Sequence, residues 1–129
     1  LLFFDDTYTA KFNNQFGNVP IVRLAEMYLT RAECNFRLSS SIGATPLDDV
    51  NTIRQRANLP PLGSINFVSE ILRERRLELA FEGHLLHDLK RTQQDVGSLP
   101  FNDPFLIFPI PQRERLINPD LEQNEAYSN

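Results

Sequence analysis

The chain has 129 residues, of which 41% are hydrophobic and 23% charged, with a formal net charge of −4. This length and hydrophobic content predict one folded domain over residues 1–129. The acidic balance argues against nucleic acid as a partner, because nucleic-acid binding selects a basic surface. A single cysteine, Cys34, excludes an internal disulfide and a cysteine-based zinc cage. No apolar run approaches the roughly 20 residues that span a bilayer.

Residues 1–19 place aromatic side chains in a polar background, for which we expect irregular structure or short strands. The helical part of the chain is predicted over residues 20–95. Its first helix follows Asn18, the candidate N-cap, and ends near the serines at 39–41. Its apolar residues recur every three or four positions, which is the spacing of an amphipathic helix. Glu33 and Arg37 are placed to form an ion pair on it, and Cys34 is expected to be a buried or half-buried thiol.

A second helix is predicted to begin at "TPLD". Thr45 is the N-cap, Pro46 occupies the first helical position, and Asp48 stands three residues after the cap. The helix runs through Ala57 and stops before Pro60. Two helices of this length joined by a short turn predict an αα-hairpin.

A third helix is predicted from Asn66, its candidate cap, to Gly83, which stands where a left-handed residue often ends a helix. A short fourth helix follows over 84–92. Five prolines in 96–129 exclude long regular elements from this segment. Its apolar stretch "FLIFPIP" predicts an extended tail that lies against the helices.

The third helix carries an unusual series of charges, with glutamates at 70, 74, 78 and 82. Like charges at successive four-residue steps repel, and apolar residues flank the helix on several sides. Some of these carboxylates are therefore expected near the core, where they need cationic partners. We predict a network with arginines from other helices: Arg23, Arg31, Arg54, Arg56 and Arg91. A solvated charged face and a catalytic or metal-binding carboxylate site are the alternatives.

One other cluster has side chains that bind metals. His84 and His87 stand three residues apart on the fourth helix, and Asp88 follows directly, so two histidines on one face are candidate zinc ligands. The competing interpretation is that both histidines pack or form hydrogen bonds at the start of a helix. The sequence has no phosphate-binding loop, no nucleophile elbow and no evident cysteine–histidine pair. No catalytic residue, metal ligand or cofactor is predicted, and a metal-dependent enzyme at His84, His87 and Asp88 is kept only as an outside alternative.

Four blocks in order resemble the C-terminal region of the SusD/RagB family, the outer-membrane nutrient-binding lipoproteins of Bacteroidetes. The blocks are "RLAEMYLTRAEC" (23–34), "LDDVNTIRQRANLP" (47–60), "ILRERRLELAFEGHLLHDLKR" (71–91) and "FPIPQRERLINPDLEQNEAY" (108–127). The resemblance implies a mainly α fold, with tetratricopeptide-like helical hairpins and an irregular, proline-rich C-terminal wrap. The sequence departs from the family pattern at Leu85, where an arginine is usual, and at His87, where an aromatic residue is usual.

The resemblance also implies a function without catalysis. Family members are anchored by a lipid on the outer face of the outer membrane, bind oligosaccharides or other nutrients, and cover a TonB-dependent, SusC-like transporter. Complete members carry several hundred residues before this region, so we expect the chain to be the C-terminal part of a longer protein. The alternative is a helical scaffold that docks on the transporter without contacting ligand itself.

The family's recurrent residues are expected to stabilise the fold rather than to bind ligand. In this sequence they include Glu26, Arg56, Arg75, Glu78, Glu82, Asp88 and Arg91. Ligand contacts in the family come from variable loops and aromatic side chains outside the blocks, so the ligand-binding residues are unknown from the resemblance. Sugars stack on tyrosine and tryptophan rings. Tryptophan is absent, and the three tyrosines stand at 8, 28 and 127, so the chain is a poor candidate for a whole binding site.

Overall fold

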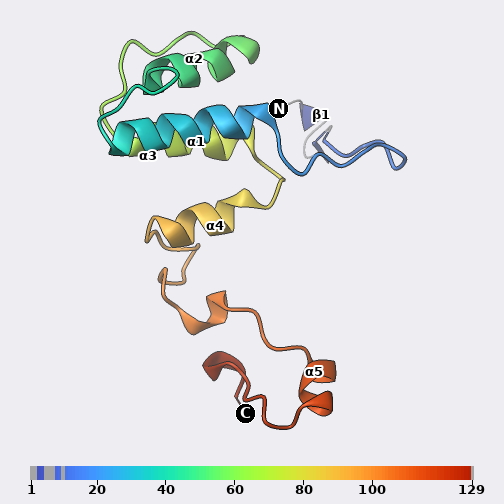
Figure 1. Ribbon diagram of the computed structural model, residues 1–129. Coiled ribbons are helices and arrows are strands. Elements are labelled where there is room, and N and C mark those ends of the chain that lie inside the picture. The colour runs from blue at the N-terminus through green and yellow to red at the C-terminus, as the bar shows by residue number, and fades with distance from the viewer. Residues whose placement is uncertain (1–2, 5–7, 10, 129) are drawn as a thin grey trace. The chain divides into compact units, whose positions relative to one another are not determined.

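The computed structural model describes residues 3–4, 8–9 and 11–128, and these form a mainly helical structure (Figure 1). The chain divides into two compact units, Leu1–Leu85 and Leu86–Asn129. Two short strands, β1 (Phe3–Phe4) and β2 (Tyr8–Thr9), pair antiparallel in the lead-in. The expectation of short strands there is confirmed. No helix of the described residues is long and apolar enough to cross a membrane.

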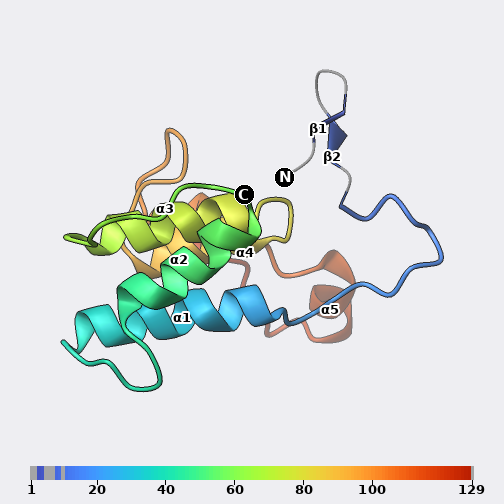
Figure 2. The ribbon, with the colours of Figure 1, turned by 90° about the horizontal axis from the view of Figure 1, so that it is seen from above.

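Three helices form the core of the N-terminal unit: α1 (Leu24–Arg37), α2 (Pro46–Arg56) and α3 (Val68–Glu78). Helix α1 packs against both α2 and α3, and the predicted α1–α2 hairpin is confirmed (Figure 2). Buried residues of α1 recur at the spacing of one helix face and meet side chains from the other two helices. The core consists of Ala25, Leu29, Ala32, Val50, Ile53 and Ile71.

Polar side chains fix the two connections between these helices. Asn35 donates its amide hydrogens to the carbonyl oxygens of Ile42 and Ala44, at 3.1 and 2.9 Å, which holds the α1–α2 turn. Asn51 both donates to and accepts from the backbone of Leu62, at 3.0 and 2.7 Å, which holds the α2–α3 loop. The buried amide of Asn35 and the half-buried amide of Asn51 thus satisfy backbone groups that no helix ladder pairs.

Helix α2 begins as the sequence predicts. The Thr45 hydroxyl accepts the backbone N–H of Asp48 at 3.1 Å, the Asp48 carboxylate accepts the backbone N–H of Thr45, and Pro46 stands at the first position. This capping box satisfies two N–H groups that lack partners inside the helix.

The predicted starts of the other two long helices are wrong. Helix α1 starts after Arg23, not Asn18. Val22 and Ile21 stay largely exposed, so a longer helix would bury little additional apolar surface. Helix α3 starts after Phe67, one residue beyond Asn66, because the Glu70 carboxylate accepts the backbone N–H groups of both residues at 2.6 and 3.0 Å.

The predicted end of the third helix is also wrong, since α3 ends at Glu78 and not at Gly83. Phe81 and Gly83 both have positive φ, 67° and 81°, and the chain turns between Leu79 and Glu82. Leu79 is buried by this turn, with 3% of its surface exposed. Cys34 differs from expectation as well, because its thiol lies on the exposed side of α1.

The C-terminal unit holds short elements, as the prolines predict. The predicted short helix is α4 (His84–Arg91), whose first two residues belong to the N-terminal unit. The 3₁₀ turn η1 (Pro104–Leu106), helix α5 (Gln112–Ile117) and the 3₁₀ turn η2 (Glu125–Tyr127) follow. Gln123 pairs with both backbone groups of Ile110, at 2.8 and 3.0 Å, and so closes a loop of this unit. The packing of the tail against the helices, and a single domain over 1–129, stay predictions.

Candidate functional site

The charges of α3 are neutralised by arginines from elsewhere in the N-terminal unit, as predicted. Arg54 of α2 donates to Glu74 of α3 at 2.6 Å, and both side chains are largely buried. Arg56, at the end of α2, donates to Glu78 at 2.6 Å. Arg23, at the start of α1, donates to the same Glu78 at 2.9 Å. The Glu78 carboxylate therefore joins α1, α2 and α3, and the solvated-face alternative is wrong.

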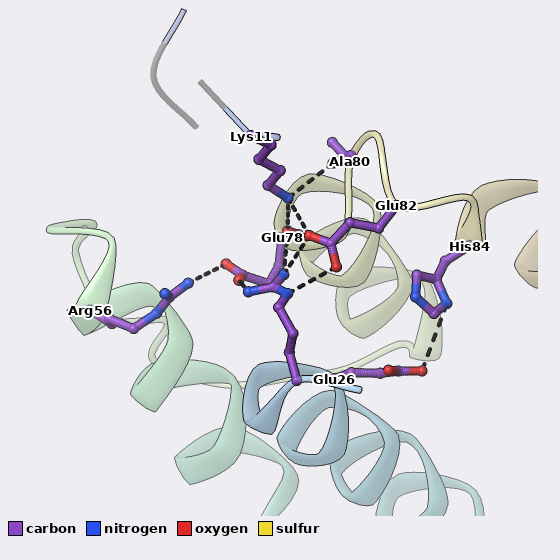
Figure 3. A network of polar contacts seen from close by, with 8 residues as sticks. Lys11, Glu26, Arg56, Glu78, Ala80, Glu82 and His84 are labelled. Carbon is purple, nitrogen blue, oxygen red and sulfur yellow. Dashed lines mark hydrogen bonds and ion pairs between the residues drawn. The ribbon is translucent and has the colours of Figure 1, made fainter. Parts of the chain in front are cut away.

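Glu82 forms the second centre of this network, beyond the end of α3 (Figure 3). Arg23 donates to its two carboxylate oxygens at 2.7 and 2.9 Å, and Lys11 donates to it at 2.5 Å. The Lys11 ammonium also donates to the carbonyl oxygens of Glu78 and Ala80, at 2.8 and 2.9 Å. Glu78 is the last residue of α3, so its carbonyl lacks a partner inside the helix, and Lys11 satisfies it and favours the helix C-terminus electrostatically.

Burial and ion pairing shift the pKa values of Glu82 and Arg23 in opposite directions. Burial raises the pKa of Glu82, but the hydrogen bonds from Arg23 and Lys11 outweigh it, and the net pKa lies below 4.5. Burial lowers the pKa of Arg23, but its bonds to Glu82 and Glu78 outweigh that effect and raise it. Both groups thus stay charged near neutral pH, as a fold-stabilising network requires.

Two of the five predicted arginine partners bind elsewhere. Arg31 forms a two-pronged pair with Asp49 of α2, at 2.6 and 2.9 Å, and not with a glutamate of α3. Arg91 pairs with Asp88 on its own helix at 2.8 Å. Two residues of these ion pairs were not predicted from the sequence. One is Asp49, whose side chain is 1% exposed, and the other is Lys11, which lies far from its partner Glu82 in the sequence. The four-residue spacing of the glutamates indicated neither of these residues, and no other local pattern singled them out.

Glu26 and Arg75, which are among the recurrent residues of the family, form a second contact between helices. The Arg75 guanidinium, which is buried, donates to the Thr30 hydroxyl at 3.1 Å and lies 3.5 Å from the Glu26 carboxylate. The same carboxylate lies 3.7 Å from Nδ1 of His84 (Figure 3). These residues hold α1 against α3 and the turn that follows α3.

The candidate metal ligands are not brought together. His84 lies beside Glu26, whereas Asp88 binds Arg91. Residues 11–128, which include all three candidates, contain no group of three histidine, cysteine, aspartate or glutamate side chains that could hold a metal ion. The metal-dependent alternative at His84, His87 and Asp88 therefore has no geometric support.

Tyr28 and Tyr127, the tyrosines whose side chains the structure describes, each contact another side chain. The guanidinium carbon of Arg31 lies 5.4 Å from the ring centroid of Tyr28. Tyr127 packs edge-on against Phe105, with ring centroids 5.7 Å apart. The side chain of Tyr8 lies outside the described residues. The lack of an aromatic platform for a sugar therefore stays a prediction.

A sequence profile described as the SusD family matches residues 3–104. The chain belongs to the SusD family. A SusD-like protein of Formosa agariphila is 37% identical over 126 residues, which cover 85% of this chain and 25% of that protein. The starch-binding protein SusD of Bacteroides thetaiotaomicron is 29% identical over 123 residues, covering 85% of this chain and 22% of that protein. The chain spans about a quarter of the length of these relatives.

Solved structures agree with this family membership. A putative sugar-binding protein of Bacteroides vulgatus superposes with a TM-score of 0.73 at 29% identity, covering 88% of this chain and 31% of that chain. A SusD superfamily protein of Parabacteroides distasonis gives a TM-score of 0.65 at 28% identity, covering 80% of this chain and 26% of that chain. The predicted mainly α, tetratricopeptide-like SusD fold is therefore confirmed.

Proposed function

We propose that this chain is the C-terminal part of a nutrient-binding protein that captures oligosaccharides for an outer-membrane TonB-dependent, SusC-like transporter. The family match over residues 3–104 carries the proposal. The relative described as a starch-binding protein supports a glycan as the ligand class. In the whole protein, a lipid anchor would hold this component on the outward-facing surface of the outer membrane.

The acidic side chains of α3 and the turn after it form contacts within the fold, which accords with a role without catalysis. The buried or half-buried carboxylates of α3 and of the turn after it bind arginine or lysine, with Glu70 accepting from backbone N–H groups at the helix start. A general acid or base needs a carboxylate that can exchange a proton with a substrate, and the low pKa of Glu82 disfavours that exchange near neutral pH.

Calorimetric titration of the full-length protein tests this function. The titrants are maltoheptaose, laminarihexaose, xylohexaose and chitohexaose, followed by a broader glycan and peptide array. We expect saturable binding of at least one glycan, with no cleavage of it during prolonged incubation. Absence of binding across the array, or release of shorter products, would contradict the proposal.

The scaffold alternative has one observation in its favour. Apolar side chains before and at the start of α1 are strongly exposed, and these are Val19, Ile21, Val22, Leu24 and Met27. Several exposed apolar side chains close together in the chain favour a protein–protein contact at this segment. Co-purification of residues 1–129 with the transporter would support docking through this region. A transporter complex that survives deletion of the region would argue against it.

A further inference from the structure

Residues 11–23 form a loop whose two ends are tied to the same side chain. Lys11 and Arg23 both donate to Oε1 of Glu82, at 2.5 and 2.7 Å, and Arg23 also donates to Oε2 at 2.9 Å. We call this arrangement the Glu82 clasp (Lys11, Arg23 and Glu82). Because the ion pairs are partly buried, they fix the ends of the loop more firmly than exposed pairs would.

The middle of the loop is ordered by one asparagine. The Asn14 carboxamide oxygen accepts the backbone N–H of Phe16 at 3.0 Å, and its backbone carbonyl accepts the N–H of Gly17 at 3.0 Å. A Cβ atom at Gly17 would lie 3.2 Å from that carbonyl oxygen, so the turn is closely packed. The loop is therefore shaped before any ligand arrives, which lowers the entropy that binding must overcome.

The loop and the clasp together line a cavity of about 430 Å³. This volume lies in the range of small-molecule sites, about 300–1,000 Å³. The clasp residues line one part of it, and Phe12, Val19 and Pro20 contribute apolar surface. All of these residues belong to the N-terminal unit.

Amide side chains give the cavity its chemical character. Asn13, Gln15 and Asn18 line it, are exposed, and make no hydrogen bond within the part of the chain that the structure describes. Each carboxamide presents two donors and an acceptor, so together they match a ligand that carries several hydroxyl groups. Lys11 and Arg23, the cations that line the cavity, already bind the carboxylates of Glu82 and Glu78, so the amides rather than these charges are the groups open to a ligand.

We propose that this cavity is a carbohydrate subsite that holds one neutral pyranose unit of an oligosaccharide. The amides of Asn13, Gln15 and Asn18 bind its hydroxyl groups, and Phe12 and Val19 cover an apolar face of the ring. The subsite rests on the proposed function, because it adds contacts from this region to a glycan that the whole protein captures. It requires no tyrosine or tryptophan, and the run "NNQFGN" at residues 13–18 is its signal in the sequence.

The test is calorimetric titration of the full-length protein with the glycan that binds most tightly among the four hexa- and heptasaccharides named above. The variant N13A/Q15A/N18A removes the three amides, and Q94A/N102A removes two exposed amides elsewhere that make no side-chain hydrogen bond within the described residues. We expect the loop variant to bind at least tenfold more weakly, since each lost hydrogen bond weakens binding about fivefold. The control should bind as the unmodified protein does.

The outcomes separate the subsite from the function on which it rests. Equal affinity of the loop variant and the unmodified protein would overturn the subsite while leaving glycan capture in place. No glycan binding by the unmodified protein would overturn both. A loop variant with a clearly lowered melting temperature would also overturn the subsite, because the amides would then pack against another part of the full-length protein.

Discussion

Adjacent arginines on α3 have opposite surroundings. Arg75 is buried with its guanidinium against Thr30 and Glu26, whereas Arg76 is exposed and makes no ion pair within the described residues. Removing one member of a buried pair leaves the other charge without its partner in a poorly solvated place. We expect Arg75→Ala to lower the free energy of unfolding by on the order of 3 kcal/mol. Glu78→Ala should have a similar effect, because it removes the partner of Arg23 and Arg56.

Arg76→Ala is the matched control, since it deletes the same side chain from the next position on the same helix. We expect it to change the free energy of unfolding by less than about 0.5 kcal/mol. Urea denaturation followed by circular dichroism measures all three variants. Equal stabilities of the Arg75 and Arg76 variants would return the helix to the solvated-face interpretation.

The low pKa of Glu82 predicts how stability depends on pH. A carboxylate whose pKa is lower in the folded state stabilises the protein above its unfolded pKa, near 4.5, and loses this effect as pH falls through the folded value. We therefore expect the melting temperature to fall between pH 6 and pH 3. Glu82→Gln should be less stable at pH 6 and should show a shallower fall. Parallel pH profiles for the two proteins would contradict the ion-pair assignment.

The ion-pair partners of single side chains were predictable from the sequence where the spacing of charges required a partner. The glutamates of α3 required cations, and three of the five predicted arginines supply them. Asp49 and Lys11 were missed because their partners are distant in sequence and only the packing of α1 against α2 and α3 brings them together. Cys34 was misplaced because the narrow apolar face of α1 turns that position towards solvent.

Among the elements, the α1–α2 turn depends on a glycine. Gly43 has φ of +79°, and a Cβ atom there would lie 2.7 Å from Nη1 of Arg31, whose other nitrogens bind Asp49. Gly97 has φ of +65° with open space around it, and Gly63 has neither constraint. We expect Gly43→Ala to lower the free energy of unfolding by about 2 kcal/mol and Gly97→Ala by about 1 kcal/mol. Gly63→Ala should have no measurable effect.

Thermal melts of the three glycine variants give this order directly. The difference between the Gly43 and Gly97 variants reports the displacement of Arg31, because both carry the same backbone strain. A Gly43 variant as stable as the Gly63 variant would mean that the turn can adopt another conformation.

Helix type and order were predictable, whereas helix ends were predictable only where a local signal is complete. Thr45, Pro46 and Asp48 form such a signal, and α2 begins there. Gly83 resembles a C-cap, but α3 ends earlier because Lys11 and Arg23 bind the carbonyl oxygen of Glu78 from outside the helix. The start of α1 and the end of α3 thus lie at tertiary contacts of Arg23 and Lys11, which local sequence patterns do not show.

For the whole molecule, the class of function was predictable from the sequence, whereas the candidate site was not. The family resemblance, confirmed over residues 3–104, indicated the class of function. It did not indicate the cavity over residues 11–23, since residues 11–22 lie outside the four blocks and the ends of the loop are held by Glu82. Blocks that recur in a family report the shared fold, whereas the proposed subsite lies in the segment before the first block.

The prediction of one domain over residues 1–129 can be tested through two side chains that stand in different units. Gln123 accepts from the N–H groups of Ile110 and Asn124 and donates to the Ile110 carbonyl, so Gln123→Ala should cost about 2 kcal/mol within Leu86–Asn129. Arg75→Ala acts within Leu1–Leu85. If the tail packs against the helices, calorimetry of the chain should show one cooperative transition that both variants lower.

Gln112→Ala, at an exposed position that forms no side-chain hydrogen bond within residues 11–128, is the control and should leave that transition unchanged. Two transitions, one lowered only by Arg75→Ala and the other only by Gln123→Ala, would contradict the single domain. Cooperative unfolding requires that the loss of one unit remove contacts which stabilise the other. A shared response to both variants would therefore demonstrate that the proline-rich tail contributes to the stability of the helical unit.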